Sequence, residues 1–263
     1  MVTGRARVKF GPRPRAEGSH VRQEDFTEDA ILGGRLRIRQ PARGYRVNVD
    51  TILLAAAVEP GSRLLEAGCG VGAASLAVAA RAPGAHVVGV ERDSDMAAFA
   101  RENVAANAMG DRITIIEGDA LDRRADWGVF DGVFVNPPFD MEGDGRAPAP
   151  VRRDSHIAEQ PISAWVAALA DRLKGGAALT MIHRAAKLAQ ILAALEGRLG
   201  GVEILPVRPR LAEPAKRVLV RARKGSRAPL VLLRGLDLHD SSGAKYTPQV
   251  DEILHGTAEI AWS

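Results

Sequence analysis

Residues 134–140 read FVNPPFD, a group of residue types that can hold an amino group. Pro137 and Pro138 have no backbone N–H, and each keeps the residue before it extended. The side-chain oxygen of Asn136 and the backbone oxygen of Pro137 are therefore two acceptors on a stiff corner, matching the two N–H donors of a planar amine. Phe139 can stack on a flat ring. We predict Asn136, Pro137, Pro138 and Phe139 as catalytic residues that present an amine to an electrophile.

A glycine-rich stretch, EAGCGVGAA at residues 66–74, is the second candidate site. Gly68 and Gly70 would let a ligand approach the backbone closely. Their spacing also fits the dinucleotide fingerprint, so a nicotinamide oxidoreductase is an alternative. Glu66 argues against a dinucleotide, because a carboxylate at this position would repel its pyrophosphate. S-adenosylmethionine carries an ammonium and a sulfonium and no phosphate, so Glu66 favours that cofactor.

Two more acids follow the next two apolar stretches. Glu91 ends residues 86–91, and its two oxygens can accept from both hydroxyls of a ribose. Asp119 follows residues 112–118 and can accept from the amino group of an adenine, while the Ala120 N–H meets a ring nitrogen. Three acids, each after a successive strand, predict one cofactor site.

The pattern around these motifs alternates strands with helices. Strands are predicted at residues 63–68, 86–91, 112–118, 130–136 and 177–183, and helices near 72–81, 94–108, 161–173 and 186–197. This predicts an α/β fold with a doubly wound, Rossmann-like parallel sheet, whose ligand site lies at the carboxyl ends of the strands. Two further strands after Gly201 predict an antiparallel edge, and residues 246–256 a short helix. Trp165 is interpreted as structural.

The chain is predicted to have three parts. Residues 1–25 form a basic flexible arm, residues 26–61 a cap of a hairpin and a helix over the cofactor, and residues 62–263 the main domain. The Gly/Pro-rich loop at residues 142–150 is expected to become ordered on substrate.

The positive charge is concentrated in a few segments. Residues 1–22, 30–49 and 208–227 carry net charges of +5, +5 and +7, whereas the whole chain carries +4. Such segregation predicts a polyanionic partner, most simply a nucleic acid. The predicted phosphate-binding residues are Arg208, Arg210, Lys216, Arg217, Arg221, Arg223 and Lys224, helped by Arg35, Arg37 and Arg39.

The amino-acid composition excludes several classes of site and of protein. Cys69 is the one cysteine, so an intrachain disulfide and a cysteine zinc site are excluded, and we interpret Cys69 as a small filler of the glycine turn. We predict no metal. Apolar runs fall short of the ~20 residues of a membrane span, and the N-terminus lacks a secretory signal. We expect a cytoplasmic monomer or homodimer.

The motifs EAGCGVG, GVERD, GDA and NPPF, in this order, resemble those of class I S-adenosylmethionine-dependent methyltransferases. The resemblance implies a seven-stranded sheet with an antiparallel last strand, and a place for Arg92 beside the cofactor. Residues 28–58, 183–195 and 214–233 are similar to segments of bacterial valine-tRNA adenine-N6 methyltransferases. That similarity implies transfer to adenine N6 in tRNA, next to the anticodon. It also implies that Arg46 or Asp50 contacts the methionine end of the cofactor, although Asp50 would equally serve to cap a helix.

The motifs do not fix which molecule accepts the methyl group. The Asn-Pro-Pro-aromatic motif also occurs in enzymes that methylate guanine N2 in rRNA or glutamine N5 in a protein. The glutamine enzymes predict a helical N-terminal domain and usually a Tyr after the prolines, and this chain has neither. A non-catalytic RNA-binding module predicts loss of Glu66, Glu91 or Asn136, and all three are present.

Overall fold

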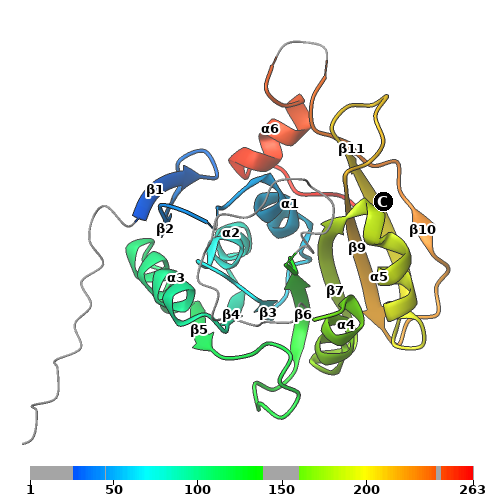
Figure 1. Cartoon of the computed structure of the whole chain (residues 1–263), viewed down its shortest axis with the longest axis horizontal. Coiled ribbons are helices and arrows are strands. Elements are labelled where there is room, and N and C mark those ends of the chain that lie inside the picture. The colour runs from blue at the N-terminus through cyan, green and yellow to red at the C-terminus, as the bar shows by residue number, and fades with distance from the viewer. Residues whose placement is uncertain (1–25, 45, 139–159, 241–243, 263) are drawn as a thin grey trace, which may run out of the picture.

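A nine-stranded sheet forms the centre of the computed structural model, which describes residues 26–44, 46–138, 160–240 and 244–262 (Figure 1). The basic arm, Phe139 and the loop at residues 142–150 lie outside the described residues. The strand order is β10-β8-β9-β7-β6-β3-β4-β5, and β11 also pairs with β8. Strands β3 to β7 are parallel, which confirms the predicted doubly wound α/β class.

The strand bounds agree closely with those predicted. The sheet consists of β3 (Arg63–Ala67), β4 (His86–Glu91), β5 (Ile113–Glu117), β6 (Phe130–Val135), β7 (Leu173–Arg184), β8 (Leu199–Arg208), β9 (Arg217–Lys224), β10 (Val231–Leu232) and β11 (Leu236–Asp237). Strand β7 begins earlier than predicted, at Leu173, and its pairing with β6 is irregular between Leu173 and Ala178, where Gly176 has a φ of +80°.

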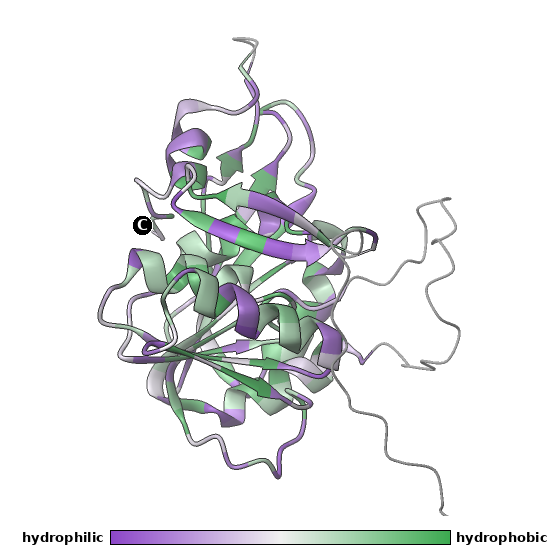
Figure 2. Ribbon diagram, turned by 90° about the vertical axis from the view of Figure 1, so that its left-hand side faces the viewer, coloured by the Kyte–Doolittle hydropathy of each residue, from purple (hydrophilic) through white to green (hydrophobic). Residues whose placement is uncertain are grey.

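The helices cover both faces of the sheet. They are α1 (Val49–Ala57), α2 (Ala73–Arg81), α3 (Ser94–Ala106), α4 (Ile162–Asp171), α5 (Leu188–Leu195) after the 3-10 turn η1 (Ala185–Lys187), and α6 (Pro248–His255). Leu64 and Phe134 point to the core beneath α1 and α2, whereas Leu65 and Val133 point to the core beneath α4 and α5. Figure 2 shows the apolar strands enclosed between these layers.

The prediction of an antiparallel edge needs a correction. Strand β9 is antiparallel, as expected for the last of seven strands, but it lies between β7 and β8 rather than at the edge. The β8–β9 hairpin places its second strand inward, where β9 pairs with β7 over seven residues from Ala178 to Arg184. Strands β10 and β11 then cover the outer edge of β8.

The segment before the core contains a hairpin and a helix. Strands β1 (Phe26–Ile31) and β2 (Leu36–Pro41) form an antiparallel pair that lies beside α3 (Figure 1). Helix α1 is buried along almost its whole length, because α2 and α6 pack on it and the C-terminal segment crosses it. Ile260 N–H donates to Ala56 O at 3.0 Å, and Trp262 Nε1–H donates to Ala57 O at 2.9 Å.

No helix in the described part of the chain is long and apolar enough to cross a bilayer.

Candidate active site

A pocket of about 380 Å³ lies at the carboxyl ends of β3, β4, β5 and β6. It brings together most of the predicted cofactor and catalytic residues, since the ends of parallel strands meet at one edge of a sheet. Those that line it are Arg46, Gly68, Gly70, Glu91, Arg92, Asp119, Ala120, Asn136, Pro137 and Pro138. Asn48, Val90, Met96, Gly118, Leu121 and Trp165 complete the wall and were not predicted.

A larger hollow of about 700 Å³ lies at the opposite, amino ends of the strands. Its wall includes Arg63, His86 and Trp127, and none of the predicted cofactor or catalytic residues. The Arg63 guanidinium there donates to the backbone oxygens of Trp127 and Val129, at 2.8 and 3.0 Å. We therefore place the active site in the smaller pocket.

The glycine loop between β3 and α2 forms one wall of this pocket. Gly68, Gly70 and Gly72 have φ values of +69°, +54° and +79°, a left-handed region that disfavours other residues. Cys69 is buried, and burial raises the pKa of its thiol well above the ordinary value. A thiol that stays protonated is a poor nucleophile, which agrees with the interpretation of Cys69 as a filler.

Glu91 braces the glycine loop from the end of β4. Its carboxylate accepts from Gly70 N–H at 2.8 Å and from Asp93 N–H at 2.9 Å, one on each oxygen. Each oxygen keeps a second lone pair for a ligand, so these bonds leave the predicted role with ribose hydroxyls possible. Asp119 similarly uses one oxygen to accept from Leu121 N–H at 2.9 Å, and its other oxygen has no partner within the described residues.

Glu66 lies behind the glycine loop rather than in the pocket wall. Its side chain points to α2 and accepts a hydrogen bond from the Ser75 hydroxyl. It is only 5% exposed, and burial raises the pKa of its carboxyl to about 8, with a smaller push from the charge of Glu91. The predicted carboxylate beside the cofactor is thus largely protonated at neutral pH in this structure.

Asn136 and Trp165 each bring an unpaired polar atom to the pocket. Asn136 Oδ1 and Trp165 Nε1 are buried, and neither has a hydrogen-bond partner within the described residues. Such atoms lose their bonds to water without replacement, at a cost of about 1–3 kcal/mol each. Trp165 comes from α4, and its ring lies 3.6 Å from the place a Cβ on Gly68 would take. A single tryptophan in an apolar helix carried no signal of this position.

The segment between the hairpin and α1 closes another side. Arg46 lines the pocket and pairs with Asp29 at 3.5 Å. Asn48 caps α1, accepting from Asp50 N–H at 2.9 Å, so the capping role considered for Asp50 belongs to Asn48. Asp50 does not line the pocket, because its buried carboxylate pairs with Arg217 Nε at 2.8 Å.

Comparison with known proteins gives the family. The sequence profile of the methyltransferase small domain matches residues 45–205, more than half of the chain. The chain belongs to this family. A protein of Porphyromonas gingivalis named tRNA1(Val) (adenine(37)-N6)-methyltransferase is 37% identical over 115 residues, covering 40% of this chain and 45% of that protein. The chain spans less than half the length of the first curated relatives that it matches.

Two solved structures agree with this assignment. A predicted O-methyltransferase from Agrobacterium tumefaciens is 32% identical with a TM-score of 0.67, covering 80% of this chain and 98% of that one. A 16S rRNA guanine-N2 methyltransferase from Thermus thermophilus, in complex with AdoMet and guanosine, shares the fold at 22% identity and a TM-score of 0.53, covering 76% and 50%. The predicted class I methyltransferase and its cofactor, S-adenosylmethionine, are confirmed.

Most of the predicted phosphate-binding side chains of this methyltransferase are already engaged. Arg221 is buried and binds both oxygens of Glu203, at 2.7 and 2.8 Å, and Glu59 at 2.6 Å. Arg223 also binds Glu59, and Lys224 Nζ donates to two backbone oxygens of the α4–β7 corner. These three side chains hold β9 in place, so we leave them out of the RNA-binding surface.

The β8–β9 loop keeps two of the predicted cations exposed. Arg208 pairs with Asp237, and Arg217 with Asp50. Among the residues that the structure places, exposed Arg210 pairs with the half-buried Glu213 alone, and exposed Lys216 has no ion pair. This loop follows the carboxyl end of β8, at the edge of the sheet that holds the pocket.

No cluster of three or more His, Cys, Asp or Glu side chains able to hold a metal occurs in the described ranges.

Proposed function

We propose that this methyltransferase transfers a methyl group to the exocyclic N6 of an adenine in tRNA, next to the anticodon. The observation that carries the proposal is the buried Asn136 Oδ1, which has no hydrogen-bond partner among the described residues and lies in the pocket that also holds Glu91 and Asp119. A stable protein rarely leaves such an atom without a partner unless a ligand supplies one. Bound S-adenosylmethionine supplies the electrophilic methyl group on its sulfonium.

Asn136 and Pro137 would orient the amine. The lone pair of an aromatic amine is delocalised into its ring, which makes the nitrogen a poor nucleophile. Asn136 Oδ1 accepts one N–H, and the Pro137 backbone oxygen accepts the other, directing the lone pair toward the methyl group. Positioning of this kind can supply about 7–11 kcal/mol of a barrier. The two oxygen dipoles also stabilise the positive charge that develops on nitrogen.

The remaining pocket residues would hold the cofactor. The free lone pairs of Glu91 suit the two ribose hydroxyls, and the free oxygen of Asp119 suits an adenine amino group. Arg46 offers a cation for the methionine carboxylate, and Arg92 adds a second cation to the wall. Phe139, which lies outside the described residues, stays a prediction as the ring that stacks on the target base.

An amine fits this corner better than a hydroxyl. An O-methyl acceptor has one O–H donor, and so it would leave one of the two oxygens of the corner unpaired. The target adenine must also leave its base stack, which costs a few kcal/mol. This cost is smaller when the adenine lies in an unpaired loop. Arg210 and Lys216 are the proposed phosphate contacts, because they are exposed at the same edge of the sheet.

Nucleoside mass spectrometry of tRNA tests this proposal. We would compare a strain that lacks the gene with strains complemented by the wild type, by Asn136→Ala and by Asn107→Ala, which removes an amide outside the pocket. N6-methyladenosine should disappear on deletion and return with the wild type and Asn107→Ala, but not with Asn136→Ala. Unchanged tRNA together with loss of N2-methylguanosine from rRNA, or of methylglutamine from a protein, would reassign the acceptor.

A further inference from the structure

Among the described strands, none pairs with the second edge of β2. Its residues Leu36, Ile38 and Gln40 face the core, while β1 pairs with one edge of the strand. The N–H and C=O groups of Arg37 and Arg39 point the other way, toward α3. Unpaired edges of this kind are costly when they are buried and prone to aggregation when they are exposed.

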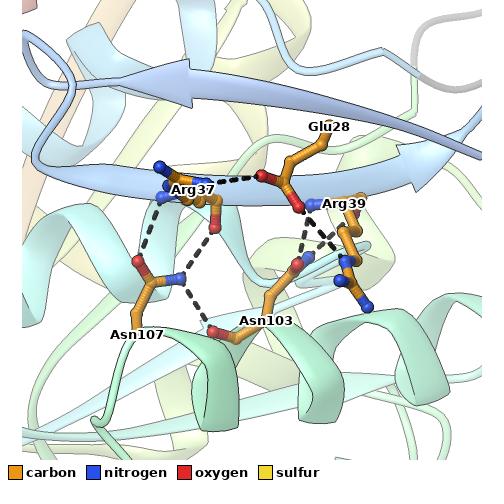
Figure 3. Close-up of polar contacts among 5 residues, drawn as sticks. All are labelled: Glu28, Arg37, Arg39, Asn103 and Asn107. Atoms are coloured by element: carbon orange, nitrogen blue, oxygen red, sulfur yellow. Dashed lines mark hydrogen bonds and ion pairs between the residues drawn. The ribbon is translucent and has the colours of Figure 1, made fainter.

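Asn103 of α3 and Asn107, which caps the C-terminal end of α3, satisfy this edge, as Figure 3 shows. Asn107 Oδ1 accepts from Arg37 N–H at 3.0 Å, and its Nδ2 donates to Arg37 O at 2.7 Å. Asn103 Oδ1 accepts from Arg39 N–H at 2.7 Å, and its Nδ2 donates to Arg39 O at 2.8 Å. The spacing matches, because four helix residues advance about 6 Å and two strand residues about 6.6 Å.

Asn103 makes one bond that Asn107 does not. Its second Nδ2 hydrogen donates to Val71 O at 2.9 Å, in the glycine loop between Gly70 and Gly72. Asn103 is fully buried, whereas Asn107 is partly exposed, and the extra bond of Asn107 goes to the last turn of α3, at Asn103 O. One amide therefore joins the hairpin directly to the glycine wall of the pocket.

The hairpin in turn holds the opposite wall. Gln40 Oε1 accepts from Val47 N–H at 2.8 Å, which ties the segment containing Arg46 and Asn48 to β2. Arg46 also contacts Thr27 and Asp29 of β1. Asn103 is thus the point at which the two sides of the pocket are fixed to each other.

We propose that Asn103 is a positioning residue for the cofactor, which sets the glycine loop against the Arg46–Asn48 wall. Its bond to Val71 O fixes the loop that carries Gly68 and Gly70, while its bonds to Arg39 fix the hairpin that carries the opposite wall. This inference concerns the binding of S-adenosylmethionine and does not depend on the identity of the methyl acceptor.

Asn107→Ala is the matched control for Asn103→Ala. Both substitutions remove one amide bridge to the hairpin, and only Asn103→Ala also frees the glycine loop. Calorimetric titration with S-adenosylmethionine alone, well below the melting temperature, should give a dissociation constant about tenfold higher for Asn103→Ala and within twofold of wild type for Asn107→Ala. Amide hydrogen exchange at residues 68–72 should become faster only in the Asn103 variant.

Asn103→Asp decides the question if Asn103→Ala does not fold. The aspartate has nearly the same size and can still accept from Arg39 N–H, but it sets an oxygen against Arg39 O and Val71 O. It should weaken cofactor binding at least tenfold. Wild-type affinity and loop exchange in a folded Asn103 variant would overturn the proposal. Equal loss of affinity in the Asn107 variant would overturn it too, since hairpin docking alone would then explain the effect.

Discussion

Glu66→Gln should make this protein more stable at neutral pH. The wild-type carboxyl is buried against α2, and its pKa is raised from 4.5 to about 8. Between these two values the unfolded chain has lost the proton and the folded chain has kept it. The free energy of unfolding therefore falls as pH rises through this window, by 1.36 kcal/mol for each unit.

The size of the effect follows from the window. At pH 7 the wild type should have lost about 3 kcal/mol relative to pH 4.5, and above pH 8 about 4 kcal/mol. A glutamine resembles the protonated carboxyl in shape and can still accept from the Ser75 hydroxyl, but it never ionises. Glu66→Gln should thus match the wild type near pH 4.5 and exceed it by about 3 kcal/mol at pH 7.

Urea unfolding at five pH values from 5 to 9, without cofactor, measures this difference directly. Ser75→Ala provides a second perturbation, because the Ser75 hydrogen bond lowers the pKa of Glu66. Loss of this hydrogen bond should raise the pKa of Glu66 further, so that the free energy of unfolding keeps falling up to a higher pH. Calorimetry at pH 7 should show nearly unchanged binding of S-adenosylmethionine to Glu66→Gln, since the wild-type carboxyl is already largely neutral at this pH and lies behind the pocket wall. A stability difference that stays constant with pH would refute the reasoning, because it would mean that Glu66 does not ionise within this range.

Three other substitutions separate structural from functional roles. Trp165→Phe keeps an aromatic ring but removes the Nε1–H, which has no partner among the described residues. We expect the melting temperature to change little and the KM for cofactor or RNA to rise several-fold. Unchanged kinetics would mean that Trp165 serves only in packing. Replacing Arg210 and Lys216 with Ala should reduce the slope of log affinity for tRNA against log salt by about 1.5 in filter binding; an unchanged slope would move the RNA-binding surface elsewhere. Arg221→Ala removes the partner of Glu203 and leaves Glu59 paired with Arg223. It should cost about 3 kcal/mol in urea unfolding, with the salt slope unaltered, and a smaller cost would show that water replaces the guanidinium.

The sequence predicts the sheet well, because burial on both faces leaves a strong apolar pattern in the central strands. The bounds of β3, β4, β5 and β6 differ from prediction by at most one residue at each end. The convergence of Gly68, Glu91 and Asn136 on one pocket follows from the same logic, since each residue follows a parallel strand. The alternation of apolar and polar residues along β8 and β9 does not indicate on which side of β8 its partner strand lies. The inner position of β9 was therefore not predicted.

Charge pairing could not be predicted, because partners are distant in sequence. The cluster of cations on β9 indicated a surface for phosphates, but Glu59 lies 162 residues before Arg221 and faces it only in the folded protein. A charge count along the chain therefore overestimates what is free to bind RNA. Asp50 is a similar case, since its pairing with Arg217 spans 167 residues.

The distribution of satisfied and unsatisfied polar groups argues for a ligand site in this pocket. Away from it, buried polar side chains such as Asn103 and Arg221 make several hydrogen bonds each. Of the three buried side-chain atoms without a partner in the described part of the chain, two, Asn136 Oδ1 and Trp165 Nε1, belong to residues of the pocket wall. A module that only bound RNA on its surface would be more stable if these atoms were paired or replaced by apolar groups. Their presence in the wall of the pocket is the pattern expected where stability is given up for binding.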